Sequence, residues 1–264
     1  MFACPKALKP MKLAHMTWEQ VGDRITAGSA IMLPVGSTEQ HGPMGRIGTD
    51  TICAEAVALQ ASNLCDAIVA PALAYTPAPF NTAFPGTVSV SANVFRALCQ
   101  EVIEGLLQQG FSGVFAVNGH GANLEPLRQV MANLPDGRLR IRSWWEPASV
   151  NSLRQEFYGE WEGMHATPSE IAITQSLLGS LPEGEAAAPP EKLSPEFIRA
   201  HSGDRHGPPD EHRARFPDGR VGSHSALARP EQGDRILQAA AMAIAEEFRQ
   251  FEAGNCRDPI PPAV

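Results

Sequence analysis

The chain has 264 residues, of which 43% are hydrophobic and 19% are charged, a composition typical of a globular protein. The formal net charge is -8, which argues against nucleic acid as the main partner because nucleic acid is bound by basic surfaces. No apolar run approaches the roughly 20 residues of a membrane span. Residues 1–10 lack the apolar core of a signal peptide, so we expect a cytoplasmic protein without membrane contact.

The five cysteines also favour a reducing compartment. They are odd in number, scattered and without a CxxC pair, which predicts free or buried thiols rather than a disulfide framework. They are Cys4, Cys53, Cys65, Cys99 and Cys256.

Hydrophobic periodicity predicts strands that alternate with helices along the chain. The strands are expected at residues 30–34, 66–73, 111–117 and 138–145, and the helices at 16–25, 51–61, 93–109, 124–134, 171–178 and 230–251. This alternation predicts βαβ units and therefore an α/β protein with a mostly parallel sheet that helices cover on both faces. Residues 182–222 have little periodicity, and we interpret them as an extended loop or lid within a single domain spanning residues 1–264.

Capping residues mark several helix starts. Thr17 is expected to cap the first helix, with Gln20 completing a capping box. Thr49 or Asp50 is placed to cap the second. Thr167 or Ser169 is placed to cap the helix at 171–178.

The first predicted strand leads into a glycine-rich loop that contains Glu39, His41 and Asp50. Loops at strand ends carry the chemistry of many α/β proteins. One nitrogen and two carboxylate groups on such a loop suit zinc, manganese or iron. The alternative is a set of surface polar residues beside a turn.

Two other histidines occupy comparable positions. His120 lies in the sequence NGHGAN at residues 118–123, directly after a predicted strand; the alternative is a turn histidine with one backbone hydrogen bond. His165 and Glu170 lie across a helix start, where an ionised carboxylate is favourable; the alternative is a capping carboxylate beside an incidental histidine. The remaining histidines are expected to be solvated: His15, His201, His206, His212 and His224.

Taken together, these motifs resemble the creatininase (creatinine amidohydrolase) family. They are GSTEQHG at 36–42, GTD at 48–50, FPGT at 84–87, NGHGAN at 118–123, HATPSE at 165–170 and GRVGS at 219–223. The resemblance implies a three-layer α/β/α sandwich, a two-metal amidohydrolase site that activates water, and a homohexamer.

The resemblance also implies roles for individual residues. Glu39 and His120 would hold one divalent cation, His41 would hold the other, and Asp50 would bridge them. Glu170 would complete the second metal's ligands or act as a base. His165 would pass a proton to the leaving nitrogen. Substrate binding is assigned to Trp161, which would stack on a planar ligand, and to Phe84 and Gly86.

Some positions depart from the family pattern. Creatinine-cleaving members have a glutamate where this chain has Ala122, and many relatives have a Glu-His pair where this chain has Phe80 and Asn81. Three hypotheses therefore stay open. The chain is a metal-dependent hydrolase of a small cyclic amide or formamide, a peptidase that trims a small peptide precursor, or a catalytically idle metal-binding scaffold.

Overall fold

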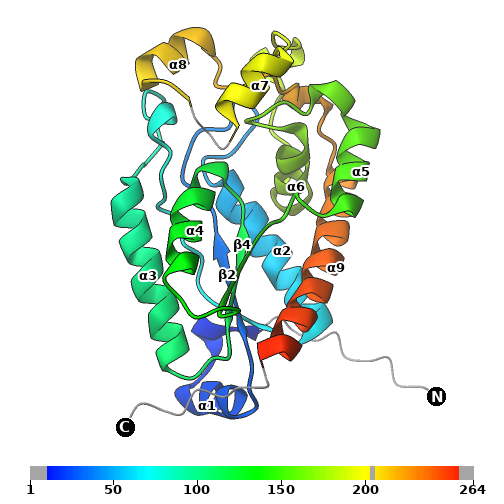
Figure 1. Cartoon of the computed structure of the whole chain (residues 1–264). Helices are drawn as coiled ribbons and strands as arrows, with labels where there is room; N and C mark the ends of the chain where they lie inside the picture. Colours follow the sequence, from blue (N-terminus) through cyan, green and yellow to red (C-terminus); the bar gives the residue numbers. More distant parts are fainter. Residues whose placement is uncertain (1–10, 203–205, 256–264) are drawn as a thin grey trace, which may run out of the picture.

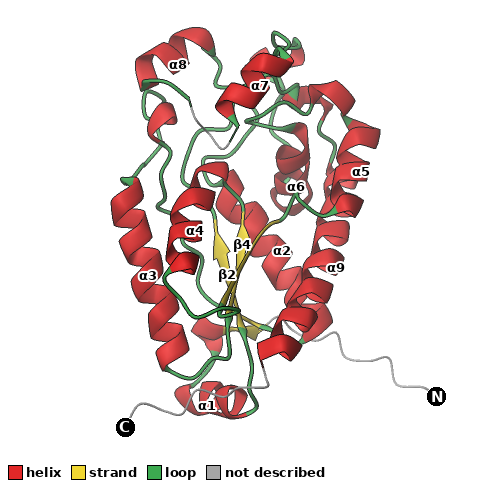
Figure 2. Cartoon of the chain, viewed as in Figure 1, coloured by secondary structure: helices red, strands yellow, loops and turns green. Residues whose placement is uncertain are grey.

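A computed structural model describes residues 11–202 and 206–255. Its strands lie in the centre of the molecule with helices on either side (Figures 1 and 2). The strands are β1 (Met11–Lys12), β2 (Ile31–Val35), β3 (Ile68–Val69), β4 (Val114–Asn118) and β5 (Leu139–Ser143). The helices are α1 (Trp18–Thr26), α2 (Thr49–Cys65), α3 (Ala92–Gln108), α4 (Leu124–Ala132), α5 (Ala148–Phe157), α6 (Pro168–Leu178), α7 (Pro195–His201), α8 (Pro209–Arg215) and α9 (Pro230–Asn255).

The described strands form one sheet in the order β1-β3-β2-β4-β5, and every pairing is parallel. In the central pair, Ile31 lies opposite Val114 and Val35 lies opposite Asn118. Because the strands are parallel, the loops that follow β2, β4 and β5 leave the sheet at the same edge. This edge faces the segment that carries α7 and α8 (Figure 1).

Alternate residues of each central strand point into two separate hydrophobic cores. Ile31 and Leu33 belong to the core that α3 and α4 cover, whereas Met32 belongs to the core beneath α2 and α9. Phe115 likewise packs against Phe248 of α9, with ring centroids 5.9 Å apart. The chain therefore has the α/β fold with helices on both faces of a parallel sheet that the sequence predicted.

The capping predictions have mixed outcomes. Thr17 and Gln20 form the predicted capping box, and Thr167 rather than Ser169 caps α6. The prediction that Thr49 or Asp50 caps the second helix is wrong, because α2 begins at Thr49 and its N-cap residue is Gly48. Asp50 lies in the first turn of α2, with its side chain turned toward two histidines.

Several elements were not predicted from the sequence. The two-residue strand β1 is defined by its pairing with β3, and α5 connects β5 to the loop before α6. The segment 182–222, interpreted as an extended loop or lid, contains the short helices α7 and α8. Of the cysteines, Cys53, Cys65 and Cys99 are free thiols, while Cys4, Cys256 and the N-terminal residues 1–10 lie outside the described residues. No helix among the described residues is long and apolar enough to cross a membrane.

The prediction that all five remaining histidines are solvated is wrong for His212, which is only 4% exposed. Its ring lies 5.0 Å from that of Phe80 and 4.8 Å from that of His206. Phe80 is itself fully buried in the middle of the 3-10 turn Pro79–Asn81. The imidazoles of His206, just before α8, and of His212, within α8, therefore pack on the apolar ring of Phe80. The sequence pattern does not reveal this contact, because the two segments are far apart in the chain.

This packing predicts a pH dependence of stability. Burial is the main reason why the pKa of His206 and the pKa of His212 are lowered to about 4, whereas an unfolded histidine titrates near about 6.5. The unfolded chain then binds more protons below about pH 6.5, so stability falls as the pH drops from about 6.5 through about 4. We expect His212→Phe to show a smaller fall in melting temperature between pH 7 and pH 5 than the parent protein. The exposed His15, changed to Phe, is the control, and equal pH profiles for His212→Phe and the parent would contradict the packing role.

Candidate metal centre

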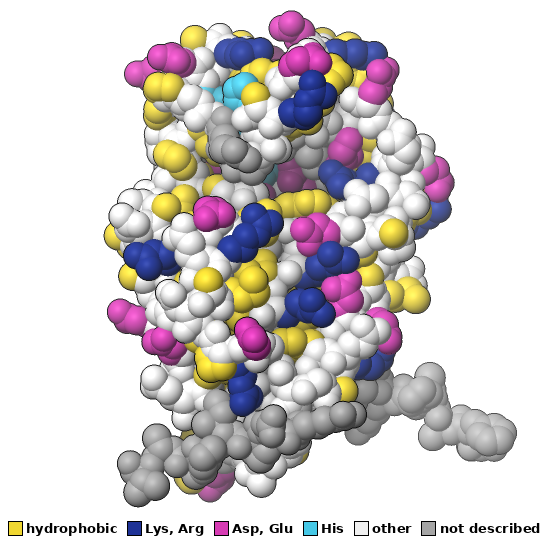
Figure 3. All heavy atoms as spheres, viewed as in Figure 1, with side chains coloured by type: hydrophobic (Ala, Val, Ile, Leu, Met, Phe, Trp, Pro, Cys, Tyr) yellow, Lys and Arg dark blue, Asp and Glu magenta, His cyan; other side chains and the backbone are white. Residues whose placement is uncertain are grey.

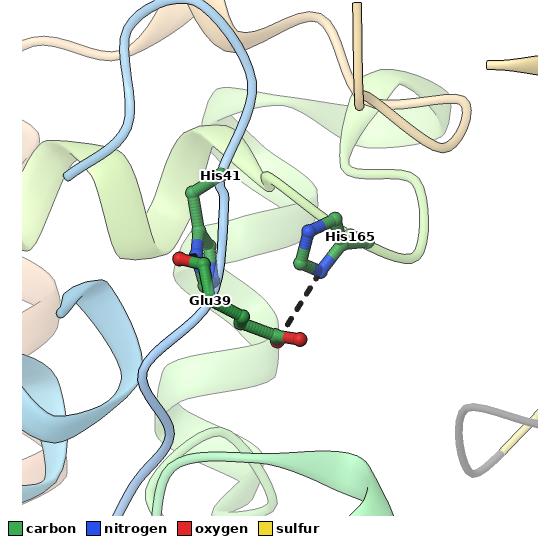
Figure 4. Close-up of side chains that lie close together, drawn as sticks. All are labelled: Glu39, His41 and His165. Carbon is green, nitrogen blue, oxygen red and sulfur yellow. Dashed lines mark hydrogen bonds and ion pairs between the residues drawn. The ribbon is translucent and has the colours of Figure 1, made fainter. Parts of the chain in front are cut away.

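Six ionisable side chains meet at the carboxyl edge of the sheet. Glu39 and His41 come from the loop after β2, and Asp50 comes from the first turn of α2. His120 follows β4, while His165 and Glu170 lie at the start of α6. Figure 4 shows Glu39 and His41 projecting from one loop and His165 approaching from another segment. All six are at most 9% exposed.

Each of the three histidines is oriented by a backbone carbonyl. The His41 Nδ1 lies 3.1 Å from the carbonyl oxygen of Glu39, and the His120 Nε2 lies 2.8 Å from that of Pro77. The His165 Nε2 lies 2.7 Å from the carbonyl oxygen of Gln40. Since a carbonyl only accepts hydrogen bonds, these nitrogens carry protons. With a cation bound, the other ring nitrogens would present their lone pairs to it. Metal-binding histidines are typically held in this way.

The second nitrogens of His120 and His41 face carboxylates. The His120 Nδ1 lies 3.1 Å from Glu39 Oε1 and 3.2 Å from Asp50 Oδ2. The His41 Nε2 lies 2.9 Å from Asp50 Oδ1 and 3.9 Å from Glu170 Oε1. Asp50 therefore offers one oxygen to each group of ligand atoms, as a carboxylate between two cations would.

The third histidine faces the same cluster from the segment just before α6. The His165 Nδ1 lies 3.8 Å from Glu39 Oε1, and its ring centroid lies 4.6 Å from that of His41. Glu39, His41 and His165 form a third group whose ligand atoms lie within 4.8 Å of one another. Ala166, which follows His165, has a positive φ of 56°, and this left-handed turn separates the histidine from the helix cap at Thr167.

Two carboxylate oxygens in the cluster support a bound cation. Glu39 Oε1 and Asp50 Oδ2 are buried and have no partner of good hydrogen-bond geometry among the described residues, although His120 Nδ1 lies within ion-pair distance of both. An unsatisfied buried anionic oxygen is costly, and a metal ion would satisfy both atoms. Oxygen and imidazole donors suit zinc, manganese or iron, so the residues present fit a divalent metal.

The mutual electrostatic effects of these groups are large. Burial alone would lower the pKa of His41, but the charges of Asp50 and Glu170 raise it to about 10. Burial would raise the pKa of Asp50, but His41 and His120 hold it well below its usual range. The pKa of His165 is lowered to about 3 mainly by burial, which keeps this imidazole neutral. Burial likewise raises the pKa of Glu170 to about 7.

Glu170 has a second role that the sequence analysis kept open. It is the capping-box residue of α6, and its carboxylate accepts a hydrogen bond from the backbone N–H of Thr167. The capping interpretation is therefore confirmed, and the same oxygen is the one that lies 3.9 Å from His41 Nε2. Glu170 joins the cluster at a longer distance than the other carboxylates.

A close contact between backbones explains one glycine of the NGHGAN motif. A Cβ atom on Gly119 would lie 2.3 Å from the carbonyl oxygen of Asp50. The loop that carries His120 therefore packs directly on the first turn of α2, where Asp50 lies. Only glycine allows this approach, which brings the two motifs together.

Gln40 and Asn81, which the sequence analysis did not assign to the site, hold the cluster in place. The Asn81 Nδ2 donates to Glu39 Oε2 over 2.9 Å, which leaves Glu39 Oε1 turned toward His120. The Gln40 Nε2 donates to Asn81 Oδ1 and to the carbonyl oxygen of Gly219. Asn81 occupies the position at which many relatives have the histidine of a Glu-His pair. This departure from the family pattern was the signal in the sequence that the position belongs to the site.

This arrangement predicts that Asn81→Leu weakens metal binding. Without the amide, Glu39 Oε2 is left without this hydrogen bond in a buried site and the carboxylate is free to rotate. Loss of such a supporting contact typically costs about 10- to 100-fold in metal affinity. Titration of the chelated protein with manganese or zinc would measure the change. Asn93→Leu, on the exposed surface of α3, is the control, and equal affinities for Asn81→Leu and the parent would refute the role.

A cavity of about 240 Å³ opens onto the cluster. It is lined by Glu39, Asp50, His120, His165 and Glu170, together with Trp144, Trp145, Arg154, Gly119, Gly121, Gly163, Met164, Thr167, Ser169 and Ser202. The two tryptophans and Arg154 were missed from the sequence. The tryptophans directly follow β5 at the same sheet edge as the other site loops, and this position was the available signal. Figure 3 shows a hollow beneath the α7–α8 segment with acidic side chains inside it.

The three residues predicted to bind substrate lie elsewhere in the structure. Trp161 is not among the lining residues, and its ring contacts His224 and the amine of Lys192. The Phe84 ring lies 5.1 Å from the guanidinium of Arg213. Gly86 has a φ of 90° and packs against Ile47. The structure thus gathers the predicted ligand residues but not these three.

Comparisons with known proteins identify relatives of this chain. The creatinine amidohydrolase (Creatininase) family model matches residues 14–248. The creatinine amidohydrolase of Pseudomonas putida is 26% identical over 265 residues, covering 92% of this chain and 97% of that protein. The mycofactocin precursor peptide peptidase of Mycolicibacterium smegmatis is 34% identical over 160 residues, covering 57% of this chain and 63% of that protein.

Solved structures show the same fold. A mutant creatininase complexed with creatine superposes with a TM-score of 0.74 at 23% identity, covering 92% of this chain and 98% of that one. The family model spans most of the sequence, and the fold agrees. This chain belongs to the creatininase family.

Proposed function

We propose that this protein is a metal-dependent hydrolase that cleaves a carbon–nitrogen bond other than a peptide bond, in a cyclic amide such as creatinine or in a formamide. The observation that carries the proposal is the common orientation of His41, His120 and His165. Each donates one ring N–H to a backbone carbonyl, and each turns its other nitrogen toward buried carboxylates. This arrangement serves metal binding and has no evident purpose in a packed core.

Two divalent cations are proposed, one among Glu39, Asp50 and His120 and one among His41, Asp50 and Glu170. When bound, such ions would acidify a water molecule and polarise the substrate carbonyl. Manganese and zinc are the first candidates, because relatives solved as manganese and zinc forms of creatininase share the fold; iron also fits the donors. Ala122 leaves one glutamate fewer than creatinine-cleaving relatives have, so Glu170 is needed for the second ion.

The remaining residues would handle protons and exclude water. His165 presents Nδ1 to the cluster, and this position makes it the candidate to pass a proton to the departing nitrogen. The Gln40 carbonyl holds the ring in the required tautomer. Trp144 and Trp145 form an apolar wall of the cavity, which strengthens electrostatic interactions with the reacting carbonyl.

A peptidase that trims a small precursor is the second candidate. It is supported by the 34% identity to the mycofactocin precursor peptide peptidase. The cavity of about 240 Å³ is small relative to most ligand pockets, which begin at about 300 Å³, and this favours a small amide over an extended peptide.

We also propose a homohexamer, as in the family; sedimentation analysis tests the assembly.

The function is tested with protein loaded separately with manganese and with zinc. Hydrolysis of a panel of lactams, hydantoins, formamides and short peptides is followed by mass spectrometry of the ring-opened, deformylated or cleaved products. Hydrolysis of a cyclic amide or formamide that stops on chelation supports the proposal. Hydrolysis of peptides alone would favour the second candidate, and no hydrolysis with either metal would favour an idle scaffold.

A further inference from the structure

We propose that the substrate carries an anionic group, a carboxylate in its simplest form, and that Arg154 recognises it. This inference rests on the proposed hydrolase function and narrows its substrate class. The metal cluster would bind the scissile amide, whereas Arg154 would fix the other end of the molecule.

Arg154 shares a cavity with the metal cluster. It lies on α5 and lines the same cavity as Glu39, Asp50 and His120. Among the described residues that line this cavity, it is the only lysine or arginine. A ligand in contact with the cluster thus lies within a small cavity that also contains a permanent cation.

The side chain of Arg154 is held in place by two hydrogen bonds. Its Nε donates to Glu162 Oε1 over 2.9 Å, and its Nη1 donates to Asn151 Oδ1 over 2.9 Å. Glu162 is further fixed by the hydroxyl of Ser169. The Arg154 and Glu162 side chains are 19% and 12% exposed, so the pair is largely shielded from water. A guanidinium held this way needs little further ordering when a ligand binds.

Of the ion pair formed by Arg154 and Glu162, the arginine is the residue that faces the ligand. Arg154 lines the cavity, whereas Glu162 does not. Guanidinium has five N–H groups in a planar fork, and Nη2 forms no hydrogen bond with another described residue. A carboxylate is the group that pairs with two parallel N–H donors of this fork.

Trp144 also lines the cavity, but its indole Nε1 is buried below the cavity surface. The indole therefore adds no donor for a ligand, and recognition of the anionic group rests on Arg154. With metal ions balancing Glu39, Asp50 and Glu170, an anionic substrate would not be repelled by the cluster.

The test uses amides in matched pairs, with and without a carboxylate, on the metal-loaded enzyme. The pairs are N-formylglycine with N-methylformamide, 5-oxoproline with 2-pyrrolidinone, and hydantoin-5-acetate with 5-methylhydantoin. We expect the parent to prefer the acid of at least one pair by 10-fold or more in kcat/KM. Arg154→Gln should lower this ratio by about 10- to 100-fold, the usual effect of losing hydrogen bonds to a charged group. Arg154→Lys, which keeps a cation beside Glu162, should retain part of the preference.

Arg235→Gln is the matched control, because Arg235 forms an exposed ion pair with Glu156 and is not a lining residue. Quenching of tryptophan fluorescence by each acid gives a binding readout that does not require turnover. An acid that binds in an Arg154-dependent way but is never hydrolysed would overturn the hydrolase function and keep the anion site. Hydrolysis without preference for any acid, or a preference that Arg154→Gln retains, would overturn the anion site and keep the hydrolase.

Discussion

Asp50→Asn is expected to reduce bound metal from about two ions per chain to less than one, whereas His120→Ala should retain about one. The difference follows from the position of Asp50, whose two oxygens face His41 and His120 separately, at 2.9 and 3.2 Å. An amide offers one neutral oxygen and cannot bridge two cations. His120 contributes to one group alone. Elemental analysis of the purified variants would measure the ratio directly.

Both variants should lose turnover by about 1,000-fold or more, because the activated water needs the assembled site. The melting temperature of each variant is measured alongside, so that a folding defect is not read as lost catalysis. His15→Ala, on the exposed surface, should keep both metal and turnover. Two retained ions in Asp50→Asn, or turnover of His120→Ala close to that of the parent, would rule out the assignment.

Chelation is expected to lower the melting temperature by roughly 5 to 10 °C and to abolish turnover. A ligand at about 100 times its dissociation constant stabilises a protein by about 2.7 kcal/mol, and each kcal/mol corresponds to about 2 to 4 °C for a chain near this size. The physical reason is that Glu39 and Asp50, with Glu170 beside them, are buried together and lose the cations that balance them. Differential scanning calorimetry would measure the shift.

Restoring manganese or zinc should recover both properties, whereas magnesium, which favours oxygen ligands, should recover less. Asp50→Asn is the matched control, because it should show little further loss when the chelator is added. A parent protein whose melting temperature and turnover are both insensitive to chelation would contradict a metal centre. A melting shift without any hydrolysis would instead support an idle scaffold.

The metal-binding motifs could be recognised in the sequence because each is local. Glu39 and His41 lie two residues apart after a buried strand, and His120 directly follows another. In a parallel sheet such loops share one edge, so their convergence followed from the alternation of strands and helices. The main helices and strands were likewise predictable from periodicity and caps, as at Thr17 and Thr167.

The rest of the site is formed by residues whose sequence neighbourhood gives no signal. Asn81 supports Glu39 across 42 positions, and Arg154 lies on a helix that had no predicted role. Trp161 was assigned to substrate binding by its spacing from His165 and is not among the residues that line the cavity, whereas Trp144 and Trp145 are. His212 was expected in water and is buried against Phe80. These contacts depend on packing between distant segments.

By itself, the sequence determined the α/β class, the family, and the loops that carry imidazoles and carboxylates, because periodicity and short motifs are properties of neighbouring residues. Only the tertiary structure decided which ring nitrogen of each histidine faces Glu39 or Asp50, which carboxylate also caps a helix, and which aromatic and basic side chains line the cavity. Those features depend on distances between atoms that the chain brings together only when α2, α5 and α6 pack around the carboxyl edge of the sheet.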